Sequence, residues 1–213
     1  MNMKKILSYI LLAAVSFCAF AEIETFSSHY EPVTSADEFD VTYIMYDSMK
    51  ISKLRRAGGV PVTQAFTIDN GLYEERFTLF KDTGSKDNSR KMEYAKVIQE
   101  YASKVSGKDL KSSDFVAFKN EDVDEEFSAD FGHTCFVVDP PSSYAKGYKY
   151  MLIEFFCKES QGIVMRTILT DDETVFTEPA DNFIYVYHSF RFSATKPRLS
   201  SSSNDDDEDT LFW

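Results

Sequence analysis

The stretch at residues 148–170 constrains the fold more than any other, because it is the densest apolar segment that follows the N-terminal region. It reads YKYMLIEFFCKESQGIVMRTILT and is interrupted once, at 158–162. The runs on either side have the length of strands and are rich in β-branched and aromatic residues. We therefore expect a central β-hairpin.

A loop at 158–162 fixes the pairing of this hairpin. It places Cys157 opposite Ile163 and Glu154 opposite Arg166. Because successive side chains alternate, both faces of the first strand are largely apolar, and such strands lie in the interior of a sheet. Cross-strand ion pairs are common structural devices, so we interpret the pair of Glu154 and Arg166 as structural rather than as a functional charge site.

The first 21 residues have the pattern of a secretory signal peptide, with a basic start, a short apolar run and a final AFA at 19–21. We expect cleavage before Glu22 and export to the periplasm or the extracellular space. The apolar run is shorter than the about 20 residues of a membrane span, so we expect no transmembrane segment in the mature chain. A lipid anchor at Cys18 is the less favoured alternative, because Phe17 stands where such signals have a small residue.

Net charge limits the classes of partner. The whole chain carries −12, and the signal peptide contains two lysines and no acidic residue, so the mature chain is more acidic still. Nucleic acids and anionic membranes bind through basic patches, which makes both poor partners. The largest basic cluster is formed by Lys50, Lys53, Arg55 and Arg56. We interpret it as an exposed face that pairs with the protein's own carboxylates, with a carboxylate or phosphate ligand as the alternative.

Two cysteines, Cys135 and Cys157, remain after cleavage. An oxidising compartment favours a disulfide between them. If their segments are antiparallel neighbours that turn about residues 145–147, the two lie opposite each other, and the bridge contributes about 3 kcal/mol. The alternative is two separate buried thiols, which behave as small apolar residues. A nucleophilic Cys135 beside His133 lacks a third orienting group, so no catalytic residue is assigned.

No residue pattern predicts a metal or a cofactor. The acidic run at 120–126 fails the EF-hand test, because Phe127 and His133 stand where a loop from Asp122 needs Gly and Glu. The three histidines of the chain are scattered and lack the spacing of zinc ligands. We therefore expect the acidic run to be a solvated loop.

The remaining patterns predict one α+β domain at 40–192, with a mostly antiparallel sheet of five to seven strands. Asn70 and Gly71, between two β-rich runs, predict a second hairpin. Residues 88–105 have apolar side chains at helical spacing and predict one long amphipathic helix packed on the sheet. The order of hairpin, helix and hairpin is similar to that of small secreted sandwich domains of the PsbP/Mog1 type.

Three segments outside these elements are also assigned. Residues 22–39 are polar and predict a mobile N-terminal segment. Residues 47–56 predict a turn of helix or an irregular connection. Residues 183–192 favour a strand over a helix, because they are aromatic and β-branched.

The last segment, 193–213, is predicted to be a disordered acidic tail with an aromatic C-terminus. It contains DDDED at 205–209 and ends in Leu211, Phe212 and Trp213. One interpretation is a linear motif that offers aromatic anchors to an envelope protein. The other, which we favour, is a solubilising tail whose aromatic end docks on the protein's own sheet or makes no contact.

These observations support three hypotheses for function. The leading one is an exported, non-catalytic binding or accessory protein of the bacterial cell envelope, which uses an exposed patch of the sheet or the C-terminal tail. The second is a periplasmic carrier of an apolar or aromatic small molecule, with a pocket between helix and sheet. The third is an enzyme with a carboxylate-based site that carries no motif.

Overall fold

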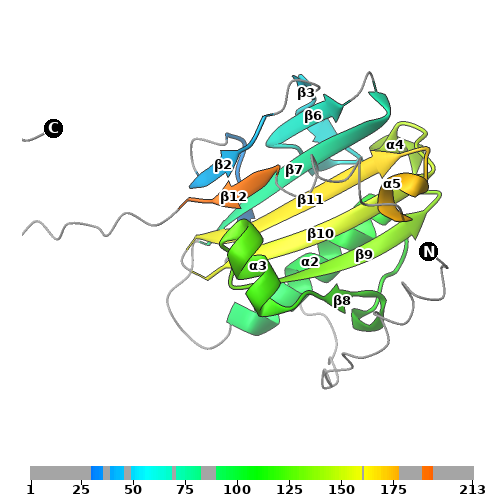
Figure 1. Ribbon diagram of the computed structural model, residues 1–213. Helices are drawn as coiled ribbons and strands as arrows, with labels where there is room; N and C mark the ends of the chain where they lie inside the picture. The colour runs from blue at the N-terminus through cyan, green and yellow to red at the C-terminus, as the bar shows by residue number, and fades with distance from the viewer. Residues whose placement is uncertain are drawn as a thin grey trace, which may run out of the picture.

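One antiparallel sheet forms the centre of the structure (Figure 1). The computed structural model describes residues 30–35, 39–45, 49–68, 71–82, 90–159, 161–177 and 189–193. Within these residues the sheet has eight strands, where the sequence predicts five to seven. Their order is β3-β6-β7-β11-β10-β9-β8, and β1 pairs with β7. The strands are β1 (Tyr30–Pro32), β3 (Met49–Ile51), β6 (Gln64–Ile68), β7 (Tyr73–Asp82), β8 (Val116–Ala117), β9 (Phe131–Val138), β10 (Tyr150–Lys158) and β11 (Gly162–Thr170).

β10 and β11 form the predicted central hairpin, with the predicted register. Cys157 lies opposite Ile163, and Glu154 lies opposite Arg166. On their outer edges, β10 pairs with β9 and β11 pairs with β7. Every residue of β11 is buried, as expected for an interior strand that is covered on both faces.

The alternation of side chains along β10 gives the sheet two distinct faces. We call the side of Met151, Ile153 and Phe155 the helix face, because α2 (Arg90–Ser106) packs on it. We call the side of Leu152 and Glu154 the front face. Figure 1 shows α2 behind the sheet, with α3 (Asn120–Phe127) and α5 (Thr174–Thr177) in front of it. The strand pair of β2 (Val41–Tyr43) and β12 (Phe190–Phe192) also lies in front.

Buried side chains from α2 fill much of the helix face, namely Tyr94, Val97, Ile98, Ala102 and Val105. The helix ends before Gly107, whose φ of +65° permits the left-handed conformation common after a helix. The pair of β4 (Arg56–Ala57) and β5 (Val60–Pro61) and the short helix α4 (Ser142–Ala145) complete this layer. Residues 88 and 89, where the predicted helix begins, lie outside the described residues.

The acidic run at 120–126 forms a helix, α3, so the predicted loop is wrong. Val123 and Phe127 lie four positions apart and are both buried against the front face, which gives the segment one apolar side. The helix ends at Ser128, in the left-handed conformation with φ +54°. The run at 120–126 contains one apolar residue, Val123. The helical spacing of apolar residues appears only when Phe127, the next residue, is included.

Two further predictions need correction. Tyr30–Pro32 pairs with β7, and Val33 and Phe39 are buried, so part of the predicted mobile N-terminal segment belongs to the sheet and its front cover. Residues 49–51 and 56–57 form β3 and β4 rather than a helical turn.

Several predictions are confirmed. β6 and β7 form the hairpin predicted from Asn70 and Gly71, with Ile68 opposite Tyr73. β12 is a strand, as favoured for 183–192, although residues 183–188 lie outside the described part. The mostly antiparallel sheet with few helices confirms the α+β class. No helix in the described ranges is long and apolar enough to span a membrane.

Candidate functional site

A cluster of charged side chains lies at the centre of the front face. It consists of Glu75 on β7, Glu154 on β10, Arg166 on β11 and Ser189, which immediately precedes β12. Arg166 donates from Nε and Nη2 to Oε2 of Glu154, each at 2.6 Å, so the predicted cross-strand pair is formed. Its Nη1 lies 3.1 Å from Ser189 Oγ and 3.6 Å from Glu75 Oε1. We call these four residues the front cluster.

Aromatic rings enclose the front cluster. The guanidinium carbon of Arg166 lies 5.2 Å from the ring centre of Phe127 and 5.4 Å from those of Phe156 and Phe190. A guanidinium at this distance is attracted to the face of an aromatic ring. Glu75 and Arg166 are at most 1% exposed and Glu154 is 6% exposed. The cluster is therefore held away from water by rings that come from α3, β10 and β12.

Glu75 belongs to a buried cluster that contains two carboxylates but one guanidinium. Burial raises the pKa of its carboxyl to about 7, although Arg166 and the hydrogen bond from Ser189 lower it. Ser189 Oγ donates to Glu75 Oε1 at 2.5 Å, whereas Glu75 Oε2 has no hydrogen-bond partner among the described residues. One guanidinium between two buried carboxylates does not offset the cost of burying the charge of Glu75.

This geometry predicts that Glu75 makes stability depend on pH. Because its folded pKa of about 7 lies above the ordinary 4.5, its contribution is full below about pH 4.5 and is lost as the pH rises to about 7. The quantity to compare is the free energy of unfolding of Glu75→Gln minus that of the natural protein. We expect this difference to increase by about 2 to 3 kcal/mol between pH 5 and pH 8. Urea unfolding at both pH values measures it, with Glu125→Gln, an exposed carboxylate on α3, as the control. Equal pH dependence in Glu75→Gln and the natural protein contradicts the expectation.

A second charged cluster lies on the helix face, directly behind the first. Arg76 Nε lies 2.7 Å from Glu74 Oε1, and Lys146 Nζ lies 3.0 Å from Glu74 Oε2. Arg76 also donates to the carbonyl oxygen of Tyr144, whose hydroxyl lies 2.8 Å from Thr167 Oγ1. The cluster fastens α4 to the sheet, so we interpret it as structural.

Both clusters depend on one stretch of β7 that the sequence analysis did not single out. Glu74, Glu75 and Arg76 are consecutive in a buried strand, so they alternate between the two faces. The sequence does contain an indication of these clusters. Three consecutive charged residues stand between Tyr73 and Phe77, whereas a strand in the middle of a sheet is usually apolar. No feature of the sequence indicates that Ser189 belongs to the front cluster.

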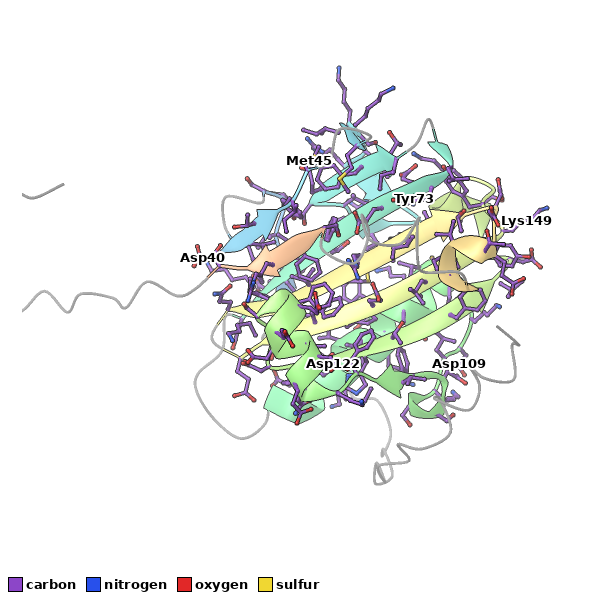
Figure 2. All side chains as sticks on the ribbon, in the orientation of Figure 1. Asp40, Met45, Tyr73, Asp109, Asp122 and Lys149 are labelled. Carbon is purple, nitrogen blue, oxygen red and sulfur yellow. The ribbon has the colours of Figure 1, made fainter. Side chains whose placement is uncertain are left out.

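The front face also has an exposed apolar area beyond the front cluster. Phe136 and Val138 of β9 are each 44% exposed. The ring of Phe136 lies 6.1 Å from that of Tyr150 and 5.6 Å from that of Phe176. Leu152, partly buried, lies opposite Phe136. We call these five residues the β9 patch. Figure 2 labels Lys149, which immediately precedes β10 at this end of the sheet near α5.

The β9 patch adjoins a strand edge that is only partly paired within the described residues. There, β8 pairs with His133 and Thr134, so Phe136 and Val138 extend past its end. The carbonyl oxygen of Val138 accepts a hydrogen bond from Lys108 Nζ at 2.9 Å. An edge of this kind can pair with an added strand. The patch therefore combines apolar side chains with a strand edge that β8 leaves uncovered in the described part of the chain.

The predicted disulfide is not formed, because Cys135 and Cys157 are both free and buried. Cys135 lies opposite Ile153, and Cys157 lies opposite Phe131. The connection between the strands contains α4 and turns about residue 144 rather than 146, which shifts the register. Burial raises the pKa of Cys135 to about 11 and that of Cys157 further. Both thiols behave as small apolar residues, the alternative considered from the sequence.

Within the described ranges, no group of three or more His, Cys, Asp or Glu side chains is placed to hold a metal. His133 lies on the helix face with Nδ1 at 3.2 Å from the hydroxyl of Tyr94, and burial lowers its pKa. Cys18 and the tail residues Leu211, Phe212 and Trp213 lie outside the described residues.

No protein-family model matches the chain, and no curated protein is significantly similar to it.

Proposed function

We propose that the protein is an exported, non-catalytic binding protein of the bacterial cell envelope, which binds an extended segment of a partner protein at the β9 patch. Export is inferred from the signal-peptide pattern of residues 1–21. Binding is inferred from Phe136 and Val138, two large apolar side chains that stand exposed on one strand, beyond the part of its edge that β8 pairs with in the described residues. This last observation carries the proposal.

The partner chemistry follows from the surface. An added strand would form main-chain hydrogen bonds with β9 beyond residue 134, and these bonds give affinity that depends little on sequence. Its alternate side chains would lie on the front face against Phe136, Tyr150 and Phe176, whose rings favour apolar and aromatic residues. The preferred partner is therefore an extended segment with apolar residues at every second position.

The other two hypotheses have less support. A carrier pocket between helix and sheet would need room where Tyr94, Ile98 and Phe155 are instead buried in one packed cluster. A carboxylate-based enzyme would use Glu75 and Glu154, but at 0% and 6% exposure they offer little surface to a solute. The β9 patch is already exposed and needs no rearrangement.

We infer a sandwich of the PsbP/Mog1 type from the order of elements and from a central sheet with layers on both faces. A shared fold does not fix function, so the binding proposal does not depend on it.

Site-specific photo-crosslinking tests the proposed function. A photoreactive phenylalanine analogue is placed at position 136 in a bacterium that exports the protein, and Leu72, a 39% exposed residue outside the patch, is the matched control position. We expect one dominant adduct from position 136 that is absent from position 72 and is lost when Val138→Asp is added. Equal adduct patterns at positions 136 and 72 would contradict the proposal.

A further inference from the structure

Next to the opposite edge of the sheet, residues 53–56 follow β3 and carry cations that have no carboxylate partner among the described residues. Lys53, Arg55 and Arg56 are exposed, and the described residues include no ion pair to any of them. Among the described residues, the side chains of Arg55 and Arg56 donate to the carbonyl oxygens of Leu54 and Gly59. The chain has 35 acidic and 23 basic residues, so three exposed cations within four positions are unexpected. For these three residues, the predicted pairing with the protein's own carboxylates is not met within the described part.

This edge also offers apolar contact. In the described part of the chain, β3 is the last strand of the sheet and pairs with β6. Ile51 on β3 is 65% exposed, and Met45, before β3, is 45% exposed. Figure 2 shows Met45 beside β3 and β6 at the upper edge of the molecule. We call Met45, Ile51, Lys53, Arg55 and Arg56 the basic edge.

Cations next to exposed apolar side chains suit an acidic peptide with large apolar residues. The C-terminal segment of this chain has that composition, with DDDED at 205–209 followed by Leu211, Phe212 and Trp213. We propose that residues 205–213 bind to the basic edge of the same molecule. The carboxylates would face Lys53, Arg55 and Arg56, and the aromatic end would cover Ile51 and Met45.

The exit point of the chain permits this contact. Ser193, the last described residue, donates its N–H to the carbonyl oxygen of Asp40 at 2.8 Å, and its side chain lies 3.2 Å from that of Thr42. β2, which holds Thr42, leads directly toward Met45 and β3. Residues 194–213 reach about 66 Å when fully extended, which is several times the spacing between neighbouring strands. Because the segment is tethered, its effective concentration is high and weak individual contacts suffice.

Trp213 is the only tryptophan in the chain, so its fluorescence reports on this segment alone. The test is acrylamide quenching of Trp213 in the mature protein and in K53E/R55E/R56E. Each exposed ion pair changes an equilibrium about two- to fivefold, so the triple variant should lower the docking constant by about tenfold or more and expose Trp213 to quenching. The matched control is K81E/K119E/K149E, which makes the same charge change at exposed positions elsewhere in the structure. It should leave Trp213 protected.

The salt dependence of Trp213 quenching in the natural protein gives a second test, which does not require the triple variant to fold. Raising the salt concentration from about 0.01 M to 1 M shortens the Debye length from about 30 Å to 3 Å and should expose Trp213 in the natural protein. Equal quenching in both triple variants overturns the proposal. If the protection of Trp213 rises with protein concentration, the segment binds to a second copy of the chain. If Phe136→Asp exposes Trp213, the segment binds to the β9 patch. Either result also overturns the proposal.

Discussion

Replacing Arg166 with methionine should lower the free energy of unfolding by about 3–5 kcal/mol at pH 7. The substitution removes the only guanidinium of the front cluster and leaves Glu75 and Glu154 buried beside one another. A buried charge without its partner is strongly unfavourable, and the rings of Phe127, Phe156 and Phe190 keep water from replacing the lost hydrogen bonds. Urea unfolding followed by circular dichroism measures the loss.

A matched triple variant separates the loss of charge balance from the loss of packing. Glu75→Gln and Glu154→Gln, added to Arg166→Met, leave polar groups of similar size but no uncompensated charge. We expect this variant to recover most of the stability, because replacing a whole buried cluster costs less than removing one member. If the single and triple variants lose the same stability, the front cluster is not held together by its charges.

Gly162→Ala should destabilise the protein by about 2–6 kcal/mol, through a strained backbone and an overfilled contact. Gly162 begins β11 with φ +142°, a conformation that residues with a side chain rarely adopt. An added Cβ would overlap the carbonyl oxygen of Phe80 and would lie 3.0 Å from a ring carbon of Phe39. The oxygen belongs to the backbone of β7, so the paired strands would have to separate. Thermal and urea unfolding measure the effect.

Gly147→Ala is the control for this substitution. Gly147 also has a positive φ, +100°, but an added Cβ meets no atom within 4 Å. Only the backbone cost of about 1–3 kcal/mol is expected there. A loss at Gly162 no larger than the loss at Gly147 would mean that β7 and β11 do not approach as closely as the register requires.

The central hairpin was predictable because its information is local. The interruption at 158–162 sets the turn, and the turn sets every pair of β10 and β11, including Glu154 with Arg166. The hairpin of β6 and β7 was predictable for the same reason, from Asn70 and Gly71. In both cases a short segment determines which residues meet.

The disulfide prediction failed because the β9–β10 connection is not a simple turn. Tyr144 and Ala145 of α4 are buried in the core on the helix face, so the connection follows the packing of the sheet rather than the sequence signal at 145–147. The resulting register places Ile153, not Cys157, opposite Cys135. A shift of this kind depends on contacts distant in sequence and could not be read from the segment itself.

The β9 patch and the complete front cluster could not be predicted from local sequence patterns. The patch lies past the end of β8, on a part of the front face where Phe136 and Val138 are exposed. The front cluster needs Glu75 and Ser189, residues far apart in sequence, to meet Arg166 from different strands. Only Glu154 and Arg166, which face each other within one hairpin, could be paired in advance.

Photo-crosslinking at position 136, in cells that export the protein, tests most directly whether the protein binds its partner at the β9 patch, as we propose. We expect a single strong adduct that requires an unaltered Val138 and does not form from position 72. No adduct from position 136, or the same set of adducts from both positions, would contradict it.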